Sequence, residues 1–69
     1  MMKETYMIES LTRDLVTRLI EEQGLTMRDA FDKVYRSSTY FALSNIESGL
    51  YFQSANYVYD EFMHEQNRL

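Results

Sequence analysis

The stretch from Glu4 to Gln23 constrains the fold of this chain more than any other, because apolar residues recur in it every third or fourth position. This spacing puts them on one side of an α-helix. They are Met7, Ile8, Leu11, Leu15, Val16, Leu19 and Ile20. At 100° per residue they cover an arc of about 200°, wider than one neighbouring helix needs. We therefore predict a long first helix. A homodimer is one alternative for this chain, and it would use Met7, Leu11, Leu15, Val16 and Ile20.

The end of this helix and the start of the next are marked by local signals. Gly24 can adopt the left-handed conformation that ends a helix, and Leu25 can pack back against the last turn. Thr26 can accept a hydrogen bond from the amide of Asp29, whose carboxylate can return one in a capping box. A second helix over 27–36 follows. Its predicted buried face comprises Met27, Ala30, Phe31, Val34 and Tyr35.

The next break falls at residues 37–39, a run of Ser and Thr. These residue types compete with the helical backbone for hydrogen bonds and supply helix caps. We predict a short third helix over 39–45. A single helix over 27–45, bent at the serines, is the alternative.

A turn then precedes the last helix. Gly49 is the residue of this turn that takes a positive φ without strain. Residues 50–52 are expected to run extended, for too few positions to form a sheet. Ser54 caps a helix over 55–66. The apolar stripe of this helix comprises Ala55, Val58, Tyr59, Phe62 and Met63.

The predicted fold is therefore all-α: one small domain, 1–69, forming a compact bundle of three to four helices at 4–23, 27–36, 39–45 and 55–66. A chain of 69 residues buries only about 60% of the surface that it exposes when unfolded, so we expect no deep catalytic cavity. The chain has no Cys and one His. Packing, alone or shared with a second subunit, must hold it together.

The charge is acidic and unevenly distributed. Eleven Asp and Glu outnumber seven Lys and Arg, for a net charge of −4. Residues 37–69 contain four acids and a single Arg. This balance disfavours nonspecific binding to nucleic acid or to anionic membranes. No apolar run is long enough for a membrane span, and the first residues lack the pattern of a signal peptide, so we expect a cytoplasmic location.

The sequence offers no support for enzymatic activity, and we expect no cofactor. Cys nucleophiles, a G-x-S-x-G motif and a phosphate-binding glycine loop are all missing. Glu61 and His64 have the i,i+3 spacing found in di-metal carboxylate sites of helical bundles. They lie opposite the apolar stripe, and no second His is present, so we expect His64 to be exposed and not to bind a metal.

The segment from Gly24 to Gly49 resembles a phage-repressor helix-turn-helix, since it begins with G-L-T and closes with I-E-S-G. It is about two residues longer than such a unit, and its turn lacks the usual glycine. The presumptive reading helix, S-S-T-Y-F-A-L-S-N, has no Arg, Lys or Gln to reach base edges. DNA binding is therefore the third hypothesis for function.

Aromatic residues are concentrated in one part of the chain, nine of the ten falling between Phe31 and Phe62. Core positions are assigned to Phe31, Tyr40 or Phe41, Phe52, Tyr59 and Phe62. So small a domain cannot enclose all nine, and Tyr is enriched at protein interfaces. We expect an exposed partner-binding surface, suited to a basic and partly apolar partner, formed by Tyr51, Tyr57, Glu47, Asp60 and Glu61.

Three segments resemble a group of short, uncharacterised bacterial proteins. The segments are Val34–Tyr40, Leu43–Tyr51 and Gln53–Asp60, and the shared pattern is L-S-x-x-E-S/T-G-L-Y/W followed by S-x-x-Y-V/I-Y. The resemblance implies an accessory or antitoxin-like protein of a small gene cluster, sometimes beside an ADP-ribosyltransferase-type toxin. The leading hypothesis is thus a non-enzymatic module that binds another protein, and a self-associating structural homodimer is the alternative.

Overall fold

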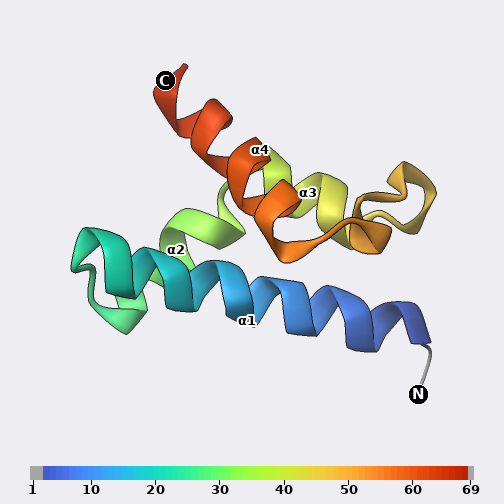
Figure 1. Ribbon diagram of the computed structural model, residues 1–69, viewed down its shortest axis with the longest axis horizontal. Helices are drawn as coiled ribbons and strands as arrows, with labels where there is room; N and C mark the ends of the chain where they lie inside the picture. Colours follow the sequence, from blue (N-terminus) through green and yellow to red (C-terminus); the bar gives the residue numbers. More distant parts are fainter. Residues whose placement is uncertain (1–2, 69) are drawn as a thin grey trace.

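Helices account for most of the chain between residues 3 and 68, the part that the computed structural model describes. Four α-helices and two short 3₁₀ turns follow one another, and no strand occurs in this part of the chain (Figure 1). The prediction of an all-α bundle is confirmed. The elements are α1 (Lys3–Gln23), α2 (Met27–Tyr35), α3 (Ser38–Ser44), η1 (Ile46–Ser48), η2 (Leu50–Phe52) and α4 (Ala55–Asn67).

Helix α1 runs along one side of the molecule and contacts α2, α3, η2 and α4 (Figure 1). It ends as the sequence predicts: Gly24 has a φ of 68°, and its N–H donates to the carbonyl of Ile20 at 3.1 Å. Leu25 packs back against the core. Although α1 has 21 residues, neither it nor another helix within residues 3–68 is apolar enough to cross a membrane.

Hydroxyl side chains cap the other three helices. Each accepts a hydrogen bond from the amide three residues later, at 3.1 Å for Thr26, 3.0 Å for Ser37 and 3.1 Å for Ser54. Such caps contribute about 1 kcal/mol each. At Thr26 the amide of Asp29 makes this bond, while the return bond from its carboxylate is absent from the described residues. The Ser37 cap makes α2 and α3 two separate helices.

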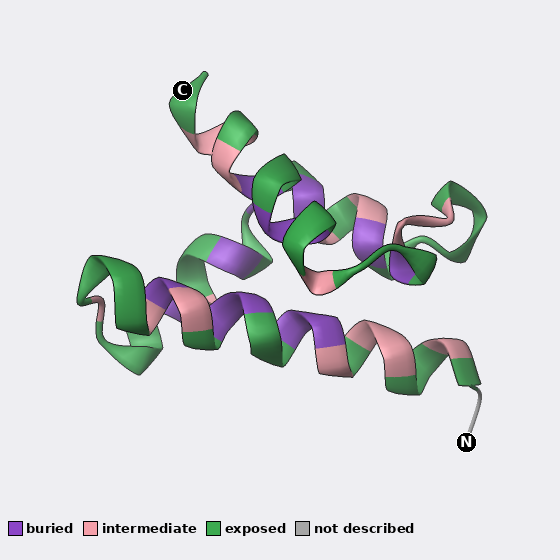
Figure 2. Cartoon of the chain, in the orientation of Figure 1, coloured by how far each residue is buried: buried purple, intermediate pink, exposed green. Residues whose placement is uncertain are grey.

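The core draws on every α-helix. The side chains of Leu19, Val34, Leu43 and Phe62, one from each, are fully buried and belong to one cluster. Figure 2 shows that the buried residues of α1 lie on the side that faces the other helices. The radius of gyration is 11.4 Å, close to the value of about 11 Å for a compact domain of this length.

The prediction of an extended segment at 50–52 is wrong, because these residues form the 3₁₀ turn η2. Successive side chains of a 3₁₀ turn point about 120° apart. Tyr51 consequently faces α1 and is only 6% exposed, whereas Phe52 points outward and is 69% exposed. The two rings stack at 4.4 Å between centroids. The sequence predicts Tyr51 at the surface and Phe52 in the core, and both predictions are wrong.

The predicted buried face of α2 is also too wide. Only Ala30 and Val34 are buried, and Phe31 is half-buried. Met27 and Tyr35 are exposed, because α2 meets α1 along the narrow row of Ala30 and Val34 and the longer side chains project past the edge of the contact.

The homodimer surface expected on α1 is wrong for most of its residues. Leu11, Leu15 and Val16 are buried within the chain itself, and Met7 and Ile20 pack against the same core. The wide apolar arc of α1 is covered by several elements of its own chain, α2 and α4 among them. No second subunit is needed to cover it.

Candidate functional site

A continuous apolar surface extends over α2 and the start of α3. We call it the α2–α3 aromatic surface, and its members are Met27, Phe31, Tyr35, Tyr40 and Phe41. The rings of Phe31 and Tyr35 stack at 5.5 Å between centroids, and those of Tyr35 and Tyr40 meet edge to face at 4.9 Å. Tyr35, Tyr40 and Phe41 also line one hollow. The rings therefore form a single connected surface.

Local structure explains why these side chains meet. Met27, Phe31 and Tyr35 are spaced by four residues, so they follow one another along the flank of α2. The buried Ser37 then joins the two helices: its hydroxyl donates to the carbonyl of Val34 at 2.6 Å and accepts from the amide of Tyr40 at 3.0 Å. This tight link brings Tyr40 against Tyr35.

The exposed area of this surface is comparable to that of the largest apolar patch on a typical monomeric protein. Met27 is 65% exposed, Tyr35 52% and Phe41 73%. At about 200 Å² per large side chain, these three contribute about 400 Å² of exposed surface. The largest apolar patch of a monomeric protein covers about 300–600 Å² and is often functional. The α2–α3 aromatic surface falls within this range.

The five predicted partner-binding residues lie on three elements, η1, η2 and α4. Tyr51 is only 6% exposed and lines a hollow beside Tyr6 and Leu11 of α1, so it does not project from the surface as predicted. Tyr57 is 47% exposed, and Asp60 and Glu61 follow it on the exposed side of α4. Glu47 is exposed on a different element, the turn η1.

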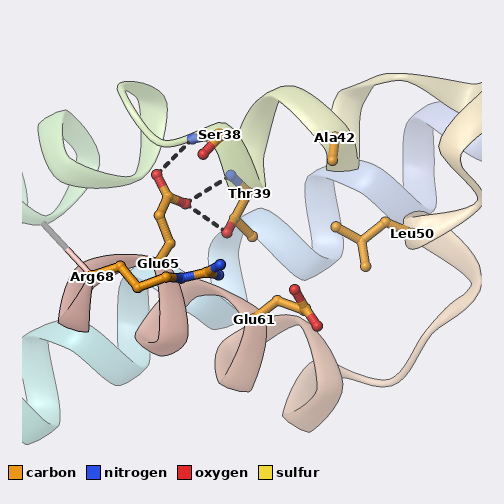
Figure 3. A pocket seen from close by; sticks show the side chains of 7 residues that line it. All are labelled: Ser38, Thr39, Ala42, Leu50, Glu61, Glu65 and Arg68. Carbon is orange, nitrogen blue, oxygen red and sulfur yellow. Dashed lines mark hydrogen bonds between the residues drawn. The ribbon is translucent and has the colours of Figure 1, made fainter.

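An open hollow of about 370 Å³ lies between α3 and α4 (Figure 3). Its most tightly bound side chain is Glu65, whose carboxylate points at the first turn of α3. One oxygen accepts from the amide of Ser38 at 2.8 Å, and the other accepts from the amide and the hydroxyl of Thr39 at 2.9 and 2.8 Å. Both oxygens are thus occupied in holding α4 to α3.

These bonds change the acidity of Glu65. Burial raises the pKa of this carboxyl, but the hydrogen bonds from Ser38 and Thr39 together outweigh burial and hold the pKa below its ordinary value. A carboxylate in this condition stays ionised at neutral pH and is a poor general base. Glu65 therefore has a structural role, which is to hold α4 to α3.

A second polar cluster joins α1 to α4. Arg18 contacts three partners: its guanidinium lies 3.7 Å above the ring of Tyr59, donates to Asn56 at 2.8 Å and pairs with Glu22 at 3.2 Å. The hydroxyl of Tyr59 donates to Glu22 at 2.9 Å. Arg18 interrupts the apolar side of α1 in the sequence, and the structure explains its presence as a link between helices.

The cluster perturbs the acidity of two of its members. Hydrogen bonds from Tyr59 and from Arg18 hold the pKa of Glu22 below its ordinary value. Burial, followed by the hydrogen bond to Glu22, raises the pKa of Tyr59. The two shifts favour an ionised Glu22 and a protonated Tyr59, the states in which the Tyr59 hydroxyl can donate to the Glu22 carboxylate.

No group of three or more His, Cys, Asp or Glu side chains within residues 3–68 is placed to hold a metal ion. His64 is exposed on α4.

Comparison with protein-family models, curated proteins and solved structures finds no match to this chain.

Sequence reasoning missed the α2–α3 aromatic surface because it assigned most of its residues to the core. A signal for it was nevertheless present. Ala30 and Val34 by themselves provide a narrow stripe for packing, and Met27, Phe31 and Tyr35 form a second row beside it at the same spacing. Helix α2 has only nine residues, and α1 is the helix that it contacts most, so one of these rows is enough for its packing.

Proposed function

We propose that this chain is a non-enzymatic protein-interaction module that binds its partner through the α2–α3 aromatic surface. The observation that carries the proposal is the chain of ring contacts from Phe31 through Tyr35 to Tyr40, next to an exposed Phe41. Aromatic residues are enriched at protein interfaces, where they supply large apolar areas and few rotatable bonds. A partner that covers Met27, Tyr35 and Phe41 would remove about 400 Å² of surface from water on this side alone.

The rigidity of the surface supports a binding role. Its rings stand on two helices with hydroxyl caps, and Ser37 ties those helices together. Side chains that are already ordered lose little conformational entropy on binding. The carboxylates of Glu22 and Glu65, by contrast, are engaged in bonds between helices and offer little to a reaction.

The identity of the partner rests on the resemblance to antitoxin-like and accessory proteins of small gene clusters. The resemblance implies that a protein of this kind binds the product of a neighbouring gene. We therefore propose that this chain binds the product of an adjacent gene. A second copy of the chain is the alternative occupant of the same rings.

The proposal is tested by comparing two double variants. One carries Tyr35→Ala and Phe41→Ala, and its matched control carries Tyr57→Ala and Phe52→Ala, which removes the same residue types at similar exposures from elsewhere. Calorimetric titration with the adjacent gene product should show affinity falling at least about tenfold for the first variant and less than about twofold for the control.

Three outcomes contradict the proposal. A loss of affinity in the control alone would move the partner to the side of Tyr57. The absence of any complex with the wild-type chain would remove the proposed partner. A wild-type dimer in light scattering that the first variant dissociates would support the homodimer instead. Circular dichroism of both variants checks that the helices remain intact.

A further inference from the structure

We infer that the groove between α1 and α2 takes up an acidic amphipathic helix of the partner. This inference rests on the proposed function and adds the chemistry of the partner. The α1–α2 groove is lined by Arg13, Val16, Thr17, Ile20, Met27 and Phe31. Because Met27 and Phe31 also belong to the α2–α3 aromatic surface, one partner can cover the groove and that surface together.

The dimensions of the groove suit protein side chains. Its volume is about 230 Å³, below the range of about 300–1,000 Å³ typical of small-molecule sites. From Arg13 to Ile20 the wall formed by α1 extends about 10 Å, which equals two helical turns. A helix laid along this wall would place two apolar side chains, one turn apart, in the groove.

The walls of the groove favour a helical ligand. An amphipathic helix commonly binds by laying its apolar face in an apolar groove, whereas strand addition needs a sheet edge, which residues 3–68 do not contain. The floor of the groove includes the buried Val16, and its rim includes the exposed Met27. Methionine is unbranched and flexible, so this rim can adapt to the side chains that enter.

The charges around the groove determine the kind of helix. Among the arginines of α1 and α2, Arg18 and Arg36 form ion pairs within their own helices. Arg13 and Arg28 form none with any residue between 3 and 68, and both are exposed. Arg13 is the one charged side chain among the residues that line the groove, and a lining with a cation and no carboxylate matches a partner with carboxylates there.

A second cation, Arg28, stands on α2 outside the residues that line the groove. Arg13 lines the groove on α1. Arg28 lies three residues before Phe31 on α2, and residues with this spacing are neighbours on a helix surface. Arginine pairs strongly with carboxylates, often through two parallel hydrogen bonds. A helix with Glu beside its apolar stripe would therefore be held on both sides, and one with Lys would be repelled.

Two synthetic peptides test this inference directly. Both carry leucine at every third or fourth position; glutamate flanks the leucines in one peptide and lysine in the other. In fluorescence anisotropy with the wild-type chain, the glutamate peptide should bind at least about tenfold more tightly than the lysine peptide. Its affinity should fall as the salt concentration rises from about 0.05 M to about 0.5 M.

Two pairs of substitutions locate the binding site. Arg13→Gln with Arg28→Gln should weaken the glutamate peptide about tenfold. Lys33→Gln with Arg68→Gln is the matched control: it removes the same charge from two other hollows, both lined by Glu65 and neither part of the α1–α2 groove. The control should change the affinity less than about twofold.

The inference is overturned if both peptides bind equally, if the glutamate peptide does not bind, or if the two pairs of substitutions act alike. It is also overturned if the wild-type chain self-associates and Arg13→Gln with Arg28→Gln dissociates it, since a second copy would then occupy the groove. Titration with the adjacent gene product separates this inference from the proposed function. Sensitivity to Tyr35→Ala with Phe41→Ala alone would leave the proposed function standing without an acidic helix, and insensitivity to both pairs would remove both proposals.

Discussion

The residue that most changes the interpretation of the sequence is Glu65. In the sequence it is one of several acids on the last helix, and in the structure it serves as a second cap for α3 in addition to Ser37. A negative charge at a helix N-terminus is favourable because the free amides there carry partial positive charge. One carboxylate thus fixes the orientation of α3 against α4.

Replacing Glu65 by Gln should lower the free energy of unfolding at pH 7 by about 1–2 kcal/mol, since a charged acceptor of helix-terminal amides is lost. The pKa of Glu65 is lowered in the folded state, so its stabilisation is fully present above the ordinary pKa and disappears as the pH falls through the lowered value. The wild-type chain should therefore lose stability on acidification below about pH 4.5, and Glu65→Gln should flatten this dependence. Urea denaturation at several pH values measures both effects.

Glu61→Gln is the control for this experiment. Glu61 lines the same hollow but accepts no hydrogen bond from any residue between 3 and 68. Its replacement should change the stability by less than about 0.5 kcal/mol. Glu22, whose pKa is also lowered, contributes to acid sensitivity in the same direction in both variants. Equal pH dependence in Glu65→Gln and Glu61→Gln would show that the bonds to α3 do not stabilise the fold.

At the scale of elements, the ends of the helices determine the arrangement. Gly24 stops α1, and Thr26 starts α2 only two residues later, so the chain reverses within a very short connection. That reversal lays Ala30 and Val34 on α1 and leaves Met27 at the rim of the α1–α2 groove. The position of the groove is thus a consequence of a helix stop and a helix cap.

Replacing Gly24 by Ala should cost about 1 kcal/mol of unfolding free energy, because its φ of 68° is strained for a residue with a Cβ atom. A Cβ at this position would meet no atom within 4 Å, so the cost lies in the backbone alone. Gly24→Asn should cost less, since Asn tolerates the left-handed region. Thermal unfolding followed by circular dichroism measures the order of stability, and an Asn variant less stable than the Ala variant would contradict this explanation.

At the scale of the whole molecule, a single core holds all the elements together. It includes side chains from each α-helix and Tyr51 from η2. With one core and no second cluster to hold any element separately, residues 3–68 are expected to unfold as one cooperative unit. Tyr51, which the sequence predicts at the surface, is part of this core.

Tyr51→Ala and Tyr57→Ala should therefore differ sharply in stability. Tyr51 is buried, and its truncation should cost about 3 kcal/mol through lost contacts and the cavity left behind. Tyr57 is half exposed, and its truncation should cost about 0.5 kcal/mol or less. Urea denaturation of the two variants measures the difference. Equal losses would mean that η2 does not hold Tyr51 in the core.

The predictions that hold depend on short-range chemistry. The stop at Gly24, the caps at Thr26 and Ser54 and the positive φ of Gly49 each involve residues a few positions apart, so each can be derived from the sequence directly. The periodicity of α1 likewise predicts a helix without reference to its neighbours. These local signals are sufficient for the number, the order and nearly the bounds of the helices.

The tertiary structure alone decided which apolar side chains are buried. Periodicity shows that a side of a helix is apolar, but the width of the covered part depends on how the neighbouring helix approaches. Tyr51 and Phe52 are adjacent and chemically alike, and the direction of the η2 turn alone places one in the core and the other in water. For the same reason Tyr35 became part of an exposed surface, because α2 rests on α1 through Ala30 and Val34. The sequence by itself determined the helices of this protein, and their packing determined which of its apolar side chains stay exposed.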